Sequence, residues 1–141
     1  PEIKINDGKL TIIEIGPRLG GDFITSQLVP LSTGVNIEDL LIQIANGIPI
    51  SYALEEKASM VSFLNFEIES RIKQLITYPE IKKLFPCVVN FELKIGLNDI
   101  PNKITNSLNR YGHFVIKGNS ASELIGKADE ISYFVHNKLF N

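Results

Sequence analysis

A charged loop that follows an apolar run near the N-terminus limits what this chain can form. Residues Thr11 to Asp22 read Thr-Ile-Ile-Glu-Ile-Gly-Pro-Arg-Leu-Gly-Gly-Asp. The β-branched run around Glu14 is typical of a strand, and Gly16-Pro17 ends it. Arg18, two adjacent glycines and Asp22 follow in a loop whose backbone is open to a ligand. This order predicts a strand that carries charged groups into a loop.

Glu14 interrupts the apolar run and has two explanations. Burying an unpaired carboxylate is costly, so a buried Glu14 needs a cation or strong hydrogen-bond donors. A magnesium ion bound to nucleotide phosphates would serve, because Mg²⁺ takes hard oxygen ligands and only one or two protein carboxylates in such sites. Alternatively, Glu14 points to solvent from a strand covered on one face. The residues alone leave both explanations open.

The loop residues also have a functional and a structural explanation each. Arg18 could grip a phosphate or carboxylate in two-pronged fashion, or it is a surface arginine. Gly20 and Gly21 could let backbone N–H groups approach an anion at a helix start, or they form a turn. Asp22 could be a general base or a metal-proximal acid, or it is the N-cap of a helix that begins at Phe23.

Asn6-Asp7-Gly8 predicts a hairpin turn between strands over residues 2–5 and 10–15. A three-residue loop places Glu2 opposite Ile12, so that Glu14 becomes its diagonal neighbour on the same face. A two-residue Asp7-Gly8 loop shifts the register by one and sends Glu2 and Glu14 to opposite faces. The hairpin geometry therefore tests whether the two acids can share a site.

The rest of the chain alternates helical and strand patterns. The first half predicts a helix from Phe23 that Pro30 limits and Gly34 ends, and a second helix capped by Asn36. The second half predicts a strand over 58–66, a helix over 67–77, a short turn over 81–85 after a break at Tyr78-Pro79, and strands over 89–95 and 111–117. A final helix is expected to start at a Ser120/Glu123 capping box, and its apolar face consists of Leu124, Ala128, Ile131, Val135 and Leu139. These elements predict an α+β fold of antiparallel strands with packed helices, with a seam over 48–57.

Composition excludes several classes of function. The 141 residues are 44% hydrophobic with a net charge of −2, which fits an ordinary buried core and gives no case for nucleic acid or a membrane surface. No apolar stretch reaches the roughly 18 residues of a membrane span. The lone Cys87 predicts a packed thiol in a reducing compartment, so a cytoplasmic location is expected.

Pro1 opens the chain without an initiator methionine, and we expect a piece of a longer protein. His113, His136 and Arg110 receive no catalytic role, and an ion pair is expected for Arg110.

Three short motifs taken together resemble the end of the ATP-grasp fold. They are Ile13-Glu14-Ile15-Gly16-Pro17-Arg18-Leu19-Gly20-Gly21-Asp22, Thr33-Gly34-Val35 and Ala45-Asn46-Gly47. Their order is similar to that in carbamoyl-phosphate synthase, biotin carboxylase and especially the L-amino-acid-ligase-like branch. Residues Asn109 to Ile116, with Gly118, Glu123 and the final helix, are similar to the small C-terminal lobe of those ligases. The resemblance implies that residues 1–50 are the C-terminal part of the ATP-grasp catalytic domain and that residues 51–141 are a small α+β lobe.

The resemblance also implies a role for each candidate residue. Its spacing maps the two acids that hold magnesium against the ATP phosphates onto Glu2 and Glu14, with Mn²⁺ as an alternative ion, and this agrees with the three-residue hairpin loop. Arg18 is implied to bind nucleotide and to stabilise the transferred phosphate or the acyl phosphate, and it stands with Asp22 as a catalytic candidate. Gly20, Gly21 and Asp22 would line the acyl-acceptor side.

The sequence departs from the family pattern at one position, and part of the family's machinery is absent from it. Many members carry Glu-x-Asn-x-Arg with the asparagine as a further metal ligand, and here that position is Gly16. The family's nucleotide-gripping lysines, glycine-rich lid and adenine pocket lie upstream of the matching region. The resemblance therefore implies a chain that is inactive alone and needs the rest of its parent polypeptide.

The expected function is part of an ATP-dependent ligase that joins a small carboxylate to an amine or thiol through an acyl phosphate. The alternatives are a non-catalytic binding or assembly module, including a homodimer, and a split subunit completed by another polypeptide. Neither the substrates nor the oligomeric state follows from the sequence.

Overall fold

The computed structural model describes residues 2–66 and 70–141. Its strands are β1 (Glu2–Asn6), β2 (Lys9–Glu14), β3 (Ala58–Phe63), β4 (Val88–Leu93) and β5 (Gly112–Gly118). Its helices are α1 (Val29–Thr33), α2 (Ile37–Ala45), α3 (Tyr78–Leu84) and α4 (Ala121–Phe140), with a π-helical turn over Ile24–Leu28 and a 3₁₀ turn over Ser107–Asn109. The fold is α+β with antiparallel sheets, as predicted.

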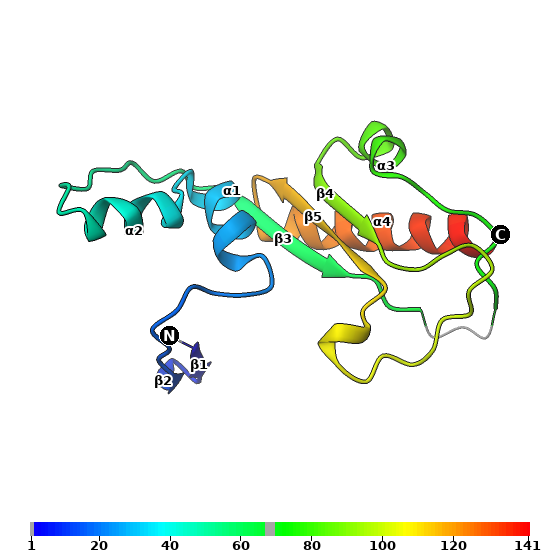
Figure 1. Cartoon of the computed structure of the whole chain (residues 1–141), viewed down its shortest axis with the longest axis horizontal. Helices are drawn as coiled ribbons and strands as arrows, with labels where there is room; N and C mark the ends of the chain where they lie inside the picture. Colours follow the sequence, from blue (N-terminus) through cyan, green and yellow to red (C-terminus); the bar gives the residue numbers. More distant parts are fainter. Residues whose placement is uncertain (1, 67–69) are drawn as a thin grey trace.

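The hydrophobic core lies between residues 58 and 140, a part of the chain that we call the C-terminal lobe. Strands β3, β5 and β4 form an antiparallel sheet in that order, and α4 runs across one face of it (Figure 1). The apolar face predicted for α4 is confirmed, because Leu124, Ala128, Ile131, Val135 and Leu139 are all buried. The Ser120 hydroxyl accepts the N–H of Glu123 at 3.2 Å, while the Glu123 carboxylate accepts the N–H of Asn119 rather than that of Ser120.

The prediction of a helix over 67–77 is wrong for residues 70–77, the part of this range that the structure describes. Residues 67–69 lie outside the described residues, and residues 70–77 are not helical. Ile72 exchanges backbone hydrogen bonds with residues 98–99, and Lys73 N–H donates to Leu139 O at 2.8 Å. These long-range partners replace helical ones, while Ile72 and Ile76 still reach the core.

Tyr78-Pro79 begins a helix instead of breaking the chain. Glu80 accepts hydrogen bonds from the N–H and the hydroxyl of Thr77 at 2.8 and 2.7 Å, so the first turn of α3 is capped. Pro79 suits this position because the first turn leaves its N–H groups without helical partners in any case.

The hairpin turn is the two-residue Asp7-Gly8, so the expected three-residue loop is wrong. Both residues have positive φ (49° and 74°), as in the tight turns that match the twist of paired strands. The register runs Asn6 to Lys9 and Ile3 to Ile12, and then shifts so that Glu2 pairs with Glu14. A bulge at Ile13 causes this shift, and it places the two acids directly opposite one another.

The helical segment after the glycines differs from expectation at its start. Asp22 does not cap it: the segment begins as a π-helical turn after Phe23, without a side-chain cap. Pro30 does not limit it either, because it lies in the first turn of α1, which continues to Gly34 as predicted. The Ser59 hydroxyl on β3 donates to Leu28 O at 2.8 Å, so this segment is attached to the lobe.

Helix α2 and the hairpin expose apolar side chains. The Asn36 cap is confirmed, since its side-chain oxygen accepts the N–H groups of Glu38 and Asp39. No residue of α2 is buried, however, and every residue of β1 and β2 is exposed. The hairpin and α2 project away from the lobe (Figure 1). Within the described part of the chain, no helix is long and apolar enough to cross a membrane.

Candidate functional site

Both hairpin acids and the loop arginine line one pocket. It has a volume of about 310 Å³ and is lined by Glu2, Glu14, Gly16, Arg18, Leu19, Gly20, Gly21 and Ile24. Strand pairing places Glu2 opposite Glu14, and the chain then turns at Gly16 to bring Arg18 to the same pocket. Five of the six residues predicted for the site therefore lie together.

The charges in this pocket lack ion-pair partners within the part of the chain that the structure describes. Among the described residues neither Glu2 nor Glu14 forms an ion pair, and Arg18 donates only to the neighbouring Leu19 carbonyl, at 3.3 Å. Two carboxylates on opposing strand positions repel each other unless a cation lies between them. Because both carboxylates are exposed, water also weakens this repulsion, so the pocket offers two acids and one guanidinium to a ligand without requiring one.

The donor set fits a metal ion that also takes ligands from its substrate. In residues 2–66 and 70–141 no group of three or more His, Cys, Asp or Glu side chains could hold a metal. Two carboxylates are too few for an all-protein cage but are typical of Mg²⁺ shared with phosphates.

Gly16 lies between the two charged groups. A Cβ built on Gly16 would be 3.6 Å from both the Glu14 Oε1 and the Arg18 Cγ, which is ordinary contact. The backbone therefore has room for a side chain at the position where many ATP-grasp enzymes carry asparagine. The absence of a side chain at position 16 is a feature of the sequence and is not required by the backbone.

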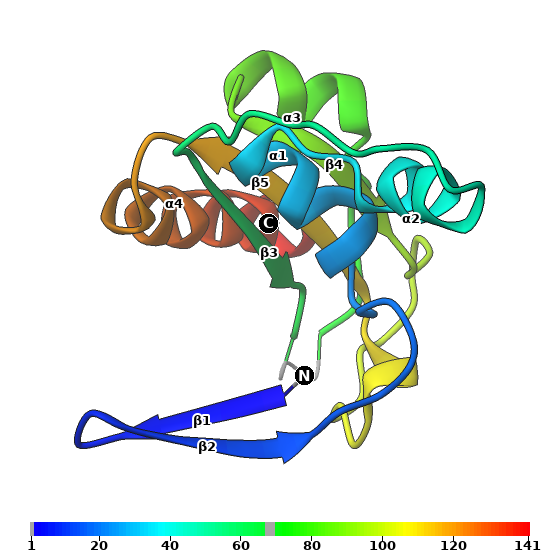
Figure 2. The same cartoon turned by 90° about the vertical axis from the view of Figure 1, so that its left-hand side faces the viewer.

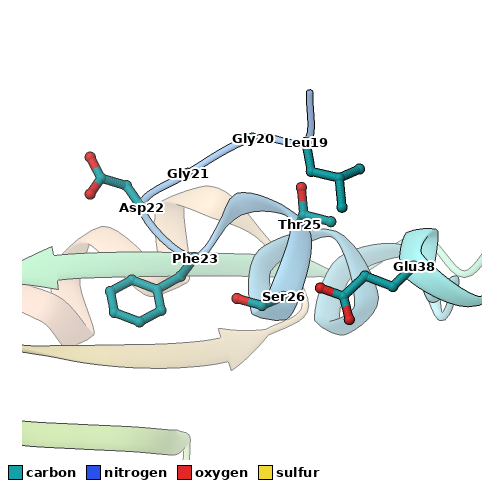
Figure 3. A pocket seen from close by; sticks show the side chains of 8 residues that line it. All are labelled: Leu19, Gly20, Gly21, Asp22, Phe23, Thr25, Ser26 and Glu38. Atoms are coloured by element: carbon teal, nitrogen blue, oxygen red, sulfur yellow. The ribbon is translucent and has the colours of Figure 1, made fainter. Parts of the chain in front are cut away.

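A second pocket of about 360 Å³ shares Leu19, Gly20 and Gly21 with the first (Figure 3). Thr25, Ser26 and Glu38 line it together with Leu19, Gly20, Gly21, Asp22 and Phe23. Glu38 lies in the first turn of α2. From the sequence such an acid only indicates a favourable interaction with the helix dipole, so its place beside the glycine loop was not predicted.

Asp22 is held by the lobe and lies outside the pocket of Glu2, Glu14 and Arg18. Its Oδ1 accepts a hydrogen bond from Arg110 Nη1 at 3.1 Å, and the Arg110 guanidinium lies 3.7 Å from the centroid of the Phe63 ring. Figure 3 shows the Asp22 carboxylate pointing away from Thr25, Ser26 and Glu38. The predicted ion pair of Arg110 is confirmed, but its partner, 88 positions away, could not be read from the sequence.

His113 is packed against the same loop. It is 5% exposed, its ring stacks on Phe23 with centroids 4.3 Å apart, and its Nδ1 lies 3.4 Å from a Glu92 carboxylate oxygen. Burial lowers the pKa of His113, and Lys94 adds to this, while Glu92 opposes it. The histidine is therefore neutral near pH 7, and its Nε2 is buried without a hydrogen-bond partner among the described residues.

Acidification is expected to lower stability through His113. Its folded pKa lies below the unfolded value of 6.5, so the unfolded chain binds more protons as the pH falls through 6.5. The free energy of unfolding should thus be highest above 6.5 and decrease toward the lower folded pKa. Urea unfolding between about pH 7.5 and about pH 5.5 measures this. His113→Gln should reduce the dependence and His136→Gln should retain it; equal pH dependence in both variants contradicts the assignment.

Two solved structures are similar to this chain over 97% of its length. Phosphoribosylglycinamide synthetase from Anaerococcus prevotii superposes with a TM-score of 0.67 and 18% sequence identity. L-amino acid ligase from Bacillus licheniformis superposes with a TM-score of 0.69 and 17% identity. The chain spans 34% of the length of each. No protein-family model matches the sequence, and no curated protein matches it.

Both of these proteins are ATP-grasp enzymes. The chain therefore has the fold of the C-terminal part of an ATP-grasp ligase, as the sequence motifs indicated.

Proposed function

We propose that this chain is the C-terminal part of an ATP-dependent ligase that joins a small carboxylate to an amine. The single observation that carries the proposal is the convergence of Glu2, Glu14 and Arg18 on one pocket, where no counterion for them is found among the described residues. A thiol acceptor is the alternative within the same chemistry. We propose that the reaction takes place in the cytoplasm, because the single cysteine, Cys87, cannot form a disulfide within the chain and fits a reducing compartment.

The proposed reaction has two steps. The γ-phosphoryl group passes from ATP to a carboxylate oxygen, which leaves ADP and an acyl phosphate. The amine then attacks the acyl carbon, the C–O bond to phosphate breaks, and an amide, inorganic phosphate and a proton are released. Both steps develop negative charge on phosphate oxygens, and preorganised cations lower such barriers.

Each residue of the pocket has a role in this proposal. Glu2 and Glu14 would hold Mg²⁺, or Mn²⁺, which when bound neutralises the phosphate oxygens. Arg18 binds the transferred phosphate with its planar guanidinium. Gly20 and Gly21 present backbone N–H groups to the acceptor side, and Asp22 follows them. With Gly16 in place of an amide ligand, this part of the chain would leave that ligand to water or to another group.

The proposal requires further protein to complete the site. The chain spans 34% of the similar ligases, and the hairpin and α2 expose isoleucine and leucine side chains that a larger protein would cover. We expect the remaining part of the parent to bring the nucleotide-gripping lysines and the lid, and the chain to be inactive alone. Lysine-bearing strands and a glycine-rich lid encoded upstream of Pro1 would support this.

Loss of ATP-dependent ligation on single substitution tests the function. In the full-length protein, Glu14→Gln removes a metal-binding charge and Arg18→Ala removes the phosphate contact. Each should lower kcat about 100-fold or more, in line with the loss of a transition-state charge contact. Phosphate release with a panel of amino acids measures turnover. Glu130→Gln and Arg71→Ala are matched controls, because they change the same residue types outside the pocket.

Wild-type turnover in both pocket variants would refute the roles assigned to Glu14 and Arg18, and a wild-type protein that performs no ligation would refute the ligase. The rival is a binding or assembly module, which the missing ligand at Gly16 favours, and it predicts no nucleotide turnover in any variant. A split subunit predicts turnover only after a separate polypeptide is mixed in.

A further inference from the structure

Two consecutive non-glycine residues follow the glycines in the left-handed conformation. Asp22 has φ 47° and Phe23 has φ 66°. Side chains disfavour this conformation, so it persists only where the surroundings hold it, and such strain gathers at functional sites. The segment from Leu19 to Asp22 carries no helix or strand of its own. Something outside the turn must therefore hold it.

Residues in or next to three strands of the C-terminal lobe contact this turn directly or through one another. Arg110, which precedes β5, donates to Asp22 at 3.1 Å and rests 3.7 Å above the ring centroid of Phe63 on β3. The Phe23 ring stacks on His113 of β5 at 4.3 Å and lies 6.5 Å from Phe63. His113 in turn approaches Glu92 on β4. Figure 2 shows the loop running from the hairpin to the lobe.

Charge and stacking act on the same point of the chain. The Arg110 side chain is 27% exposed and the Asp22 side chain 61%, so water screens part of their ion pair, and the contact of Arg110 with the Phe63 ring adds to it. The aromatic contacts of Phe23 fix the next residue along. Together they anchor the chain directly after Gly20 and Gly21, which line both pockets.

We propose that Arg110 and Asp22 are positioning residues, by which the C-terminal lobe sets the backbone of Gly20 and Gly21 relative to Arg18. On this view the Asp22 carboxylate is an anchor and not the proton acceptor of the reaction. Its Oδ1 is engaged by Arg110, and its side chain points away from Thr25 and Ser26 (Figure 3). The kinetic consequence rests on the proposed ligase function, whereas the anchoring itself does not.

Amide hydrogen exchange on the 141-residue chain tests the anchor without any assumption about catalysis. The reporter is the N–H of Ile24, which donates to Gly21 O at 2.9 Å and closes the strained turn. Asp22→Asn and Arg110→Ala should each raise its exchange rate about tenfold relative to the core amide of Ile131. The double variant should exchange no faster than Arg110→Ala alone, because Arg110→Ala already removes the contact with Asp22.

Arg71→Ala is the matched control, because Arg71 donates to Asn98 O at 3.2 Å and makes no contact with the loop. It should leave Ile24 exchange unchanged. Arg110→Lys keeps the charge and should recover part of the protection. Unchanged Ile24 exchange in Arg110→Ala, or additive increases in the double variant, overturns the proposal.

Kinetics of the full-length protein test the consequence. Asp22→Asn and Arg110→Ala should lower kcat by a similar factor, about tenfold or more, because a displaced loop misorients the reacting groups. The pH profile of kcat should keep its shape in both. A lost acidic limb or a far larger loss in Asp22→Asn alone would show that Asp22 is a base, and would overturn the proposal. If the wild-type protein performs no ligation, the proposed function fails and the exchange experiment alone decides the anchor.

Discussion

Gly112→Ala is expected to prevent the lobe from forming its sheet. Gly112 begins β5 with φ 147°, and a Cβ there would collide with the carbonyl oxygen of Glu92 and lie 3.1 Å from the Leu93 Cα. Both neighbours are backbone of the paired strand β4, so neither can move without breaking the ladder. A conformational penalty and a backbone clash act together, and we expect a loss of about 4 kcal/mol or more, close to the whole stability of a small domain.

Urea unfolding followed by circular dichroism measures this loss. Gly126→Ala is the control, because a Cβ at Gly126 meets nothing within 4 Å and Gly126 lies inside α4. It should stabilise the chain by about 0.5–1 kcal/mol, since alanine has the higher helix propensity. A Gly112→Ala chain with the wild-type midpoint would show that β4 and β5 do not pair as described.

Ile131→Ala is expected to cost about 2–5 kcal/mol, the range for deleting a buried isoleucine side chain. Ile131 is 0% exposed in the middle of α4, where it packs into the core beneath the sheet. The remaining cavity is lined by α4 and the sheet, which are tied by many other contacts and cannot collapse onto it. The midpoint of thermal or urea unfolding should therefore fall well below that of the wild type.

Ile125→Ala provides the same chemical change on the opposite side of the same helix. Ile125 is 55% exposed, so its truncation should alter stability by no more than about 0.5 kcal/mol. Similar losses in the two variants would mean that α4 does not present the buried face described here.

These stability variants bear on function through the loop. Arg110, His113 and Phe63 all belong to the lobe, and they contact Asp22 or Phe23 beside the candidate site. A lobe that loses β5 also loses these contacts. We therefore expect Gly112→Ala to release the glycine loop, although no residue of the pocket has changed.

Local patterns were sufficient for the elements whose partners lie nearby in the chain. The spacing of Leu124, Ala128 and Ile131 predicted the buried face of α4, and Asn36 predicted the start of α2. Both depend on contacts within a few residues. The motif from Glu14 to Asp22 indicated the fold, and solved structures with that fold match the chain.

Tertiary structure decided what depends on distant partners. Residues 70–77 have a helical spacing, yet hydrogen bonds to residues 98–99 and 139 hold them in another conformation. Asp22 has the sequence of an N-cap, yet Arg110 holds it outside the helix in a strained turn. Such partners are invisible to a local pattern.

For the opposed acids, sequence and structure each contributed a part. The residues alone determined that Glu2, Glu14 and Arg18 are close in the chain to a tight turn and a flexible loop. The structure decided the strand register: a bulge at Ile13 shifts the register set by the two-residue turn by one residue and places the acids directly opposite each other. The reason is that side chains alternate between faces along a strand, so one extra residue on one strand determines whether two carboxylates meet.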